Sequence, residues 1–145
     1  MGDNNITIGD QLGGNQEIID GFVNEAKEYL NAVGDDFLNL EKQKDNPDQA
    51  LIDKVFRAIH SVKGASGFLG LDNMGVLAYV METMLTRMRA GKMRPESEYM
   101  DALLAGVDLL SAMLDDIKHS NEVDISSVHD RLSKQLEETI KGDTS

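Results

Sequence analysis

The spacing of apolar residues along the chain predicts helices. Apolar side chains recur every three or four residues over long stretches, as they do on one face of an α-helix. The first stretch covers about residues 16–40, either as one long helix or as two helices broken near Gly34. The pattern then continues over four more stretches: 47–69, 72–90, 96–118 and 125–141. Because short loops join these helices and no strand-like alternation separates them, we expect an all-α, up-down helical bundle of about five helices with a four-helix-bundle core.

Residues at the ends of these stretches are typical of helix caps. Asn46 can accept hydrogen bonds from free backbone N–H groups, and Pro47 suits the first helical position, so a helix is expected to begin there. Asp72 is expected to cap the next helix in the same way. Gly70 and Gly91 follow the expected ends of two helices, where glycine can adopt the left-handed conformation that stops a helix.

A single domain suits a chain of this length, which is 145 residues. Residues 1–15 are rich in Gly, Asn and Asp and are expected to form a flexible N-terminal segment. Residues 16–141 are the expected domain. Residues 142–145 are expected to be a frayed tail, or the point where a longer chain has been cut.

Composition and charge restrict the partners. With 26 acidic and 14 basic residues the formal net charge is −12, which argues against nucleic acids and anionic membranes. Cysteine is absent, so disulfides and thiolate metal sites are excluded. No apolar run approaches the ~20 residues that span a bilayer, and no signal peptide is visible, so we expect a cytoplasmic chain without membrane insertion. Arg87, Arg89 and Lys92 cluster near one helix end, either because cations favour the helix dipole there or as a binding patch.

The stretch 47–69 carries an unusual polar strip. Its expected apolar face contains Leu51, Val55, Ala58, Val62 and Leu69. The opposite strip contains His60, Phe56, Arg57, Lys63, Gly64 and Gly67. A lone surface histidine is usually inert, but each glycine costs a helix interior roughly 1 kcal/mol relative to alanine. Two glycines beside His60 therefore indicate a place where another protein comes close to the imidazole, with Phe56 as an exposed apolar anchor.

These residue types suit nucleophilic chemistry at phosphorus. An imidazole titrates near neutral pH, so a neutral ring nitrogen is available in the cell. A carboxylate bonded to one ring nitrogen would fix the tautomer and make the other nitrogen more nucleophilic. Glu82, on the flank of the next helix, is the candidate carboxylate, and a solvated surface role for it fits the pattern equally well. Lys63, one turn after His60, could balance the charge of phosphoryl oxygens.

Three segments resemble a known family. The run FRAIHSVKGASGFLG, from Phe56 to Gly70, resembles the phosphorylation motif of histidine phosphotransfer (HPt) domains. The continuation LAYVME from Leu77, followed by Leu85, Arg89 and Gly91, is similar to the next helix of the N-terminal domain of CheA-type chemotaxis histidine kinases. The segment FVNEAKEYL from Phe22 is similar to the first helix of that domain. The likeness covers about residues 16–120.

The resemblance implies a phosphorelay carrier. His60 would accept a phosphoryl group from ATP through a separate histidine kinase catalytic domain and pass it to an aspartate on a CheY- or CheB-like response regulator receiver domain. Glu82 would orient the imidazole and Lys63 would balance charge. The docking surface would contain Phe56, Arg57, Gly64 and Gly67.

The resemblance also implies what this domain lacks. ATP and Mg²⁺ would be bound by partner domains, and this domain would hold no cofactor or metal. The isolated domain would not be an enzyme, and it would be a monomer. Its parent would be a CheA-like protein-histidine kinase. Members of the family often carry a second histidine where this chain has Tyr79, and a tyrosine can still donate a hydrogen bond to the network around His60.

Two other functions compete with this interpretation. Di-iron bundles use Glu-x-x-His on helices, but no histidine of this chain has Glu three residues before it and no His-x-x-x-His pair occurs. His119 and His129 are expected to be plain surface residues. A non-catalytic interaction module could keep the fold without phosphotransfer, although the presence of His60, Lys63, Gly64 and Glu82 argues against it. No Walker-type ATP loop is present.

Overall fold

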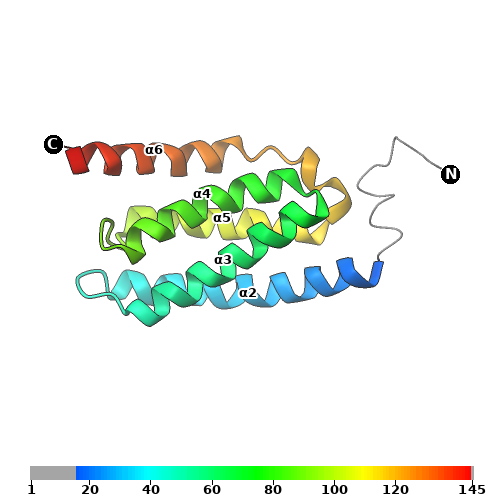
Figure 1. Ribbon diagram of the computed structural model, residues 1–145, viewed down its shortest axis with the longest axis horizontal. Coiled ribbons are helices and arrows are strands. Elements are labelled where there is room, and N and C mark those ends of the chain that lie inside the picture. Colours follow the sequence, from blue (N-terminus) through cyan, green and yellow to red (C-terminus); the bar gives the residue numbers. More distant parts are fainter. Residues whose placement is uncertain (1–15, 145) are drawn as a thin grey trace.

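The structure is a computed structural model that describes residues 16–144, all of it built from helices and their connections (Figure 1). In chain order the elements are α2 (Gln16–Lys42), α3 (Gln49–Leu69), α4 (Asp72–Arg89), α5 (Ser97–Asp115), the 3₁₀-helix η1 (Ile117–Glu122) and α6 (Ser126–Thr144). Successive α-helices run in opposite directions, and the described residues contain no strand. The predicted all-α, up-down bundle is therefore confirmed. The predicted flexible segment 1–15 lies outside the described residues.

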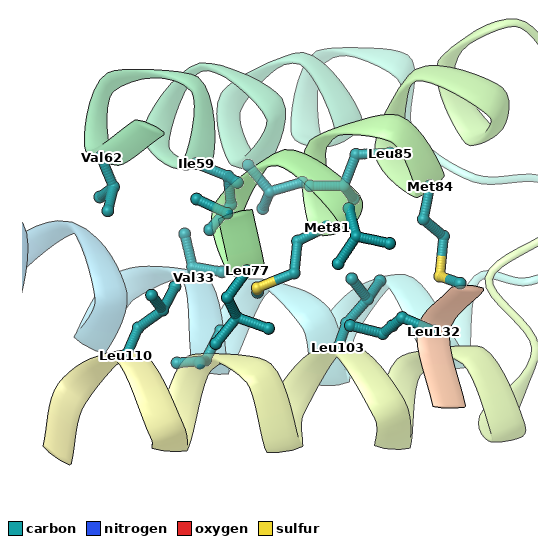
Figure 2. Close-up of a cluster of buried hydrophobic side chains, with 14 of the residues drawn as sticks. Val33, Ile59, Val62, Leu77, Met81, Met84, Leu85, Leu103, Leu110 and Leu132 are labelled. Carbon is teal, nitrogen blue, oxygen red and sulfur yellow. The ribbon is translucent and has the colours of Figure 1, made fainter. Parts of the chain in front are cut away.

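Helices α2 to α5 form the four-helix core, and α6 packs against α4 and α5 on the side away from α2 (Figure 1). Apolar side chains from all five α-helices meet inside, as Figure 2 shows for Val33 of α2, Ile59 of α3, Met81 of α4, Leu103 of α5 and Leu132 of α6. The burial of such side chains is the main stabilising term for a bundle. It also fixes how α3 lies against α4, which positions the site described below.

Helix α4 is buried on more than one face. Its buried residues are Met74, Leu77, Ala78, Val80, Met81, Met84, Leu85 and Met88. The breadth of this surface follows from its neighbours, because α3, α5, η1 and α6 all contact it. Gly106 of α5 allows one of these contacts: a Cβ atom there would lie 2.7 Å from the sulfur of Met81. The helix that carries Glu82 is thus held from several sides.

The predicted boundaries of the first two helices need one correction. Helix α2 runs unbroken through Gly34, so the single long helix is the right alternative. The N-cap of α3 is Asp48 rather than Asn46, because the Asp48 carboxylate accepts the Ala50 N–H at 2.9 Å. Pro47 consequently precedes the cap. Gly70 ends α3 with φ of 72°, the left-handed conformation that favours glycine, as predicted.

The predicted apolar face of α3 is only partly correct. Val55 and Val62 are buried as predicted, but Leu51, Ala58 and Leu69 are only half-buried. The remaining fully buried positions are Ile52, Ile59 and Ser66. Because α3 packs against both α2 and α4, its buried surface is centred between two neighbours and is rotated from the face that was predicted.

The start of α4 is secured by a distant residue. Leu71 is the N-cap and makes no side-chain capping bond, while Asp72 lies in the first turn, so the predicted Asp72 cap is wrong. Instead the Asn121 side chain of η1 accepts the Asn73 N–H at 3.1 Å and donates to the Gly70 carbonyl at 3.0 Å. The Asn73 amide in turn donates to the Asn121 carbonyl at 2.9 Å. We call this set of bonds the Asn121 bridge.

The C-terminal part of the bundle also differs from prediction. The stretch 96–118 does not form one helix: α5 ends at Asp115, and η1 follows. Helix α6 continues through residues 142–144, where a frayed tail was predicted, and the Asp143 carboxylate accepts a 2.6 Å hydrogen bond from Arg87 of α4. Within the described residues, no helix is both long enough and apolar enough to cross a membrane.

Candidate functional site

His60 and Glu82 meet across the outer seam between α3 and α4. The Nδ1 atom of His60 lies 2.8 Å from Oε2 of Glu82. Lys63, one turn after His60 on α3, donates from Nζ to the other carboxylate oxygen, Oε1, at 2.9 Å. Residues three apart share a helix face, so α3 presents both donors to one carboxylate of α4. The structure therefore brings together the three residues that the sequence proposed as a set.

The hydrogen bond defines which nitrogen of His60 can react. An ionised carboxylate only accepts hydrogen bonds, so Nδ1 must carry the proton in the His60–Glu82 bond. In the neutral ring the lone pair is then on Nε2. That atom makes no hydrogen bond with any residue between 16 and 144. The His60 side chain is 59% exposed, whereas that of Glu82 is 14% exposed. The arrangement leaves a nucleophilic nitrogen open to solvent above a fixed carboxylate.

The ionisation of Glu82 is set by opposing effects. Burial is the largest single influence and favours the neutral acid, but the hydrogen bonds from Lys63 and His60, together with their charges, outweigh it and lower the pKa of Glu82. The carboxylate is therefore ionised at neutral pH. Lys63 contributes the larger of the two hydrogen-bond effects. Its ammonium group thus stabilises the negative charge that orients the imidazole.

Aromatic and cationic side chains extend the site on both sides. The ring of Phe56 stacks on the His60 imidazole, with centroids 5.8 Å apart and planes inclined by 12°. The guanidinium carbon of Arg89 lies 4.0 Å from the centroid of the Phe56 ring. The Lys63 ammonium lies 5.5 Å from the centroid of Tyr79. Tyr79 makes this cation–π contact in place of the predicted hydrogen bond, because its hydroxyl has no hydrogen-bond partner in the described part of the chain.

The exposed phenylalanine near His60 is Phe68 and not, as predicted, Phe56. Phe56 is half-buried and packs against the core, whereas the Phe68 side chain is 84% exposed. Phe68 lies about two turns beyond His60 on α3 and roughly a quarter turn around the helix from it. The helical period could have identified it, since it follows His60 by eight residues. The contact of Arg89 with Phe56 was not predicted, because it depends on how α4 packs on α3.

The glycines of the strip are exposed and are not required by packing within the bundle. A Cβ atom placed on Gly64 or Gly67 would meet no atom within 4 Å apart from its own turn of helix and its chain neighbours. Both therefore lower helix stability without serving an internal contact. Arg57, the remaining predicted docking residue, is exposed but lines the groove between α2 and α3, next to Lys54 and Ser61. No hydrogen bond or ion pair within residues 16–144 joins it to His60 or Glu82.

The other two histidines have different surroundings. His119 is exposed, as predicted, and its Nδ1 lies 2.9 Å from Oδ1 of the exposed Asp116. That hydrogen bond is the main cause that raises the pKa of His119. His129 is partly exposed, and its Nδ1 lies 3.6 Å from the carboxylate of Asp130. Within residues 16–144, no three His, Cys, Asp or Glu side chains cluster closely enough to hold a metal ion.

Comparison with known families and sequences agrees with this geometry. A family model for the Hpt domain matches residues 17–120. The chemotaxis protein CheA of Halobacterium salinarum is 32% identical over 108 residues, covering 74% of this chain and 16% of the relative. CheA of Bacillus subtilis is 33% identical over 118 residues, covering 80% of this chain and 17% of the relative. The chain thus spans about a sixth of the length of these curated relatives.

Solved structures show the same likeness. The CheA phosphotransferase domain from Thermotoga maritima superimposes with a TM-score of 0.65 at 38% identity, covering 70% of this chain and 94% of that one. The phosphorylated P1 domain of CheA3, solved in complex with CheY6 from R. sphaeroides, gives a TM-score of 0.74 at 26% identity and covers 85% and 98% of the two chains.

Proposed function

The chain belongs to the Hpt domain family, and from this premise we propose that it is a phosphorelay carrier whose phosphoacceptor is His60. One observation carries the assignment of His60. Its Nδ1 is bound to a carboxylate with a lowered pKa, its Nε2 makes no hydrogen bond with any residue from 16 to 144, and its side chain is 59% exposed. Neither His119 nor His129 combines a shielded carboxylate with a neighbouring lysine.

The transfer can be written on the atoms of this site. The lone pair of His60 Nε2 attacks phosphorus, an N–P bond forms, and the bond from phosphorus to the leaving oxygen of the nucleotide breaks. No proton leaves Nε2, because the proton of the neutral ring is on Nδ1. The ring becomes cationic at Nδ1–H, and the Glu82 carboxylate stabilises that charge across 2.8 Å. In the second step a carboxylate oxygen of the acceptor attacks phosphorus and the N–P electrons return to Nε2.

In this scheme the main role of Lys63 is to stabilise the ionised carboxylate of Glu82. Its ammonium is bound to the carboxylate and not directed at Nε2. It keeps Glu82 ionised despite burial, and it lies close enough to the imidazole to attract phosphoryl oxygens during transfer. Tyr79, whose ring faces the same ammonium, restricts where Lys63 can move.

The partners follow from the CheA relatives. The phosphoryl group comes from ATP on a histidine kinase catalytic domain and goes to a receiver domain of the CheY or CheB kind, with ATP and Mg²⁺ held by those partner domains. A related domain is solved with CheY6. The chain is then the phosphotransfer part of a cytoplasmic CheA-like kinase, monomeric when isolated. Exposed Gly64, Gly67 and Phe68 beside His60 form the surface on which these partners dock.

Labelled ATP and a CheA-type kinase core provide the test. We expect acid-labile label on the wild-type chain and on a His119→Gln control, none on His60→Gln, and chase of the label onto a receiver domain. Label that persists on His60→Gln would disprove the phosphoacceptor assignment. A wild-type chain that binds the kinase core and receiver but takes no label would instead favour the non-catalytic interaction module.

A further inference from the structure

We infer that Phe56, held by Arg89, is a positioning residue that sets the plane of the His60 imidazole. The inference rests on the proposed function, in which His60 Nε2 is the nucleophile. Phe56 contacts both of the other side chains at the seam between α3 and α4. Phe56 lies one turn before His60 on α3, and Arg89 reaches the Phe56 ring from the last turn of α4.

The hydrogen bond to Glu82 is not enough to orient the ring. It fixes the position of one atom, Nδ1, but still permits the imidazole plane to tilt about the line from Nδ1 to the carboxylate. The reactive lone pair lies in the plane of the ring, so a tilt changes the direction in which Nε2 points. Phosphoryl transfer needs the attacking and leaving atoms roughly in line with phosphorus. A second contact on the ring face is therefore needed to fix the line of attack.

Phe56 supplies that contact. Its ring is nearly parallel to the imidazole, at 12°, and the 5.8 Å centroid separation is within the range of offset stacking. Phe56 also packs against the bundle core, so it is itself supported from within. Phe56 therefore restricts the tilt of the imidazole from one side, while the His60 side chain as a whole stays 59% exposed. The predicted use of Phe56 as an exposed docking anchor does not agree with this half-buried position.

Arg89 holds Phe56 from the neighbouring helix. Its guanidinium carbon lies 4.0 Å from the ring centroid, well inside the cation–π range. Its charged partner is Asp53 of α3, whose Oδ1 is 3.9 Å from the guanidinium, a longer and weaker contact. Arg89 thus ties two turns of α3 to the end of α4. Loss of its planar cation should loosen Phe56 more than it loosens the bundle.

A matched set of variants separates positioning from packing. Phe56→Leu keeps an apolar side chain but removes the stacking face, whereas Phe56→Tyr keeps it. Phe22→Leu is the control, since Phe22 is another half-buried ring that packs against the core, on α2, without a ring contact to His60. Each variant is phosphorylated by a CheA-type kinase core over a range of domain concentrations. Thermal unfolding reports on packing.

We expect Phe56→Leu to lower kcat about tenfold with little change in KM, because a misdirected nucleophile reacts slowly even when it is bound. Phe56→Tyr and Phe22→Leu should keep kcat within about twofold. Arg89→Gln should lower kcat several-fold and Arg89→Lys should restore part of it, since an ammonium also binds the ring face. In proton NMR, the ring-proton signals of His60 should move in Phe56→Leu, which lacks the aromatic ring current, and stay close to their wild-type positions in Phe56→Tyr.

Three results would overturn the inference while leaving the proposed function intact. They are an unchanged kcat in Phe56→Leu, an unchanged His60 signal in that variant, or a rise in KM alone, which would indicate docking. If the wild-type chain takes no label from any kinase core, the proposed function itself fails. The NMR arm still reports whether Phe56 orients the imidazole in that case.

Discussion

Two histidines of this chain hold a carboxylate at nearly the same distance, one on the α3–α4 seam and one on η1. His60 lies 2.8 Å from Glu82, and His119 lies 2.9 Å from Asp116. The first carboxylate comes from another helix, is shielded from solvent and is bound to a lysine. The second comes from a residue three positions earlier and is 68% exposed. A histidine–carboxylate pair is therefore not in itself a phosphoacceptor site.

The surroundings decide what each pair does. Water can replace Asp116 as a partner of His119 at little cost, because both side chains are solvated. At the α3–α4 seam, burial of Glu82 makes its charge costly unless Lys63 and His60 stay bound to it. Hydrogen bonds of nearly the same length therefore orient the imidazole of His60 but hold that of His119 only weakly.

The largest expected difference between the two sites is in reactivity. Glu82→Gln should slow phosphorylation of His60 by about ten- to a hundredfold, because an amide cannot stabilise the cationic ring or enforce its tautomer as a carboxylate does. Asp116→Asn is the matched control and should leave the rate within about twofold. Initial rates with a kinase core at fixed ATP measure both. Equal rates for the two variants would remove the distinction between the sites.

A smaller effect is expected from closing the approach to His60. Gly64→Ala should slow transfer with protein partners by about tenfold, since a methyl group would stand on the docking surface beside the imidazole. Gly34→Ala, in the middle of α2, should leave transfer unchanged. Both should stabilise their helices by up to about 1 kcal/mol, because neither methyl meets another atom within 4 Å.

Urea unfolding and quench-flow transfer measure the two quantities separately. Slower transfer in a more stable protein cannot come from misfolding. Wild-type transfer rates for Gly64→Ala would show that the glycine strip is not a place of close approach.

Acid stability should depend on Lys63. Because the pKa of Glu82 is lowered in the folded chain, its contribution to stability is present above the unfolded-state pKa and is lost as pH falls through the lowered value. Lys63→Met removes the main hydrogen bond that opposes burial, so the pKa of Glu82 should rise and about 1 kcal/mol of stability at neutral pH should be lost. Urea unfolding between acidic and neutral pH measures this, with Glu82→Gln as the variant that has no carboxylate to titrate.

The smallest expected effect concerns the pKa of His119 on η1, which is raised, whereas that of Glu82 is lowered. The pKa of His119 is raised, chiefly by its hydrogen bond to Asp116, so any stabilisation is present below the unfolded-state pKa and is lost as pH rises through the raised value. Asp116→Asn should bring the His119 pKa back down. An NMR titration of the His119 ring protons checks this, and an unchanged midpoint would contradict the assigned cause.

Much of the fold could be predicted from local sequence, because helix formation and apolar periodicity are local properties of the chain. The five helical stretches, the stop at Gly70 and the pairing of His60 with Glu82 could all be expected from spacing and from the resemblance. The N-cap of α3 could not be predicted from sequence, because Asn46 and Asp48 are both residue types that favour this position and lie two residues apart. The hydrogen bond from the Ala50 N–H to the Asp48 carboxylate, seen only in the folded chain, distinguishes them.

What the sequence could not predict depends on contacts between distant residues. The Asn121 bridge joins η1 to the corner between α3 and α4, and no local sequence pattern predicts it. The contact between Phe56 and Arg89 depends on how α4 packs against α3. The cation–π contact of Tyr79 likewise depends on where Lys63 is held by Glu82. In each case helix packing, and not helix propensity, determines the partner.

The Asn121 bridge connects residues 51 positions apart in the chain, from the Gly70 carbonyl to the side chain on η1. The turn between α3 and α4 therefore cannot open by itself, and local fluctuations there require η1 to detach as well. In native-state hydrogen exchange, the amide protons of Leu71 and Asn73 should open together with those of η1 as one cooperative unit. If α3 moved along α4, His60 would separate from Glu82. The Asn121 bridge restrains this movement, although its residues take no part in the chemistry.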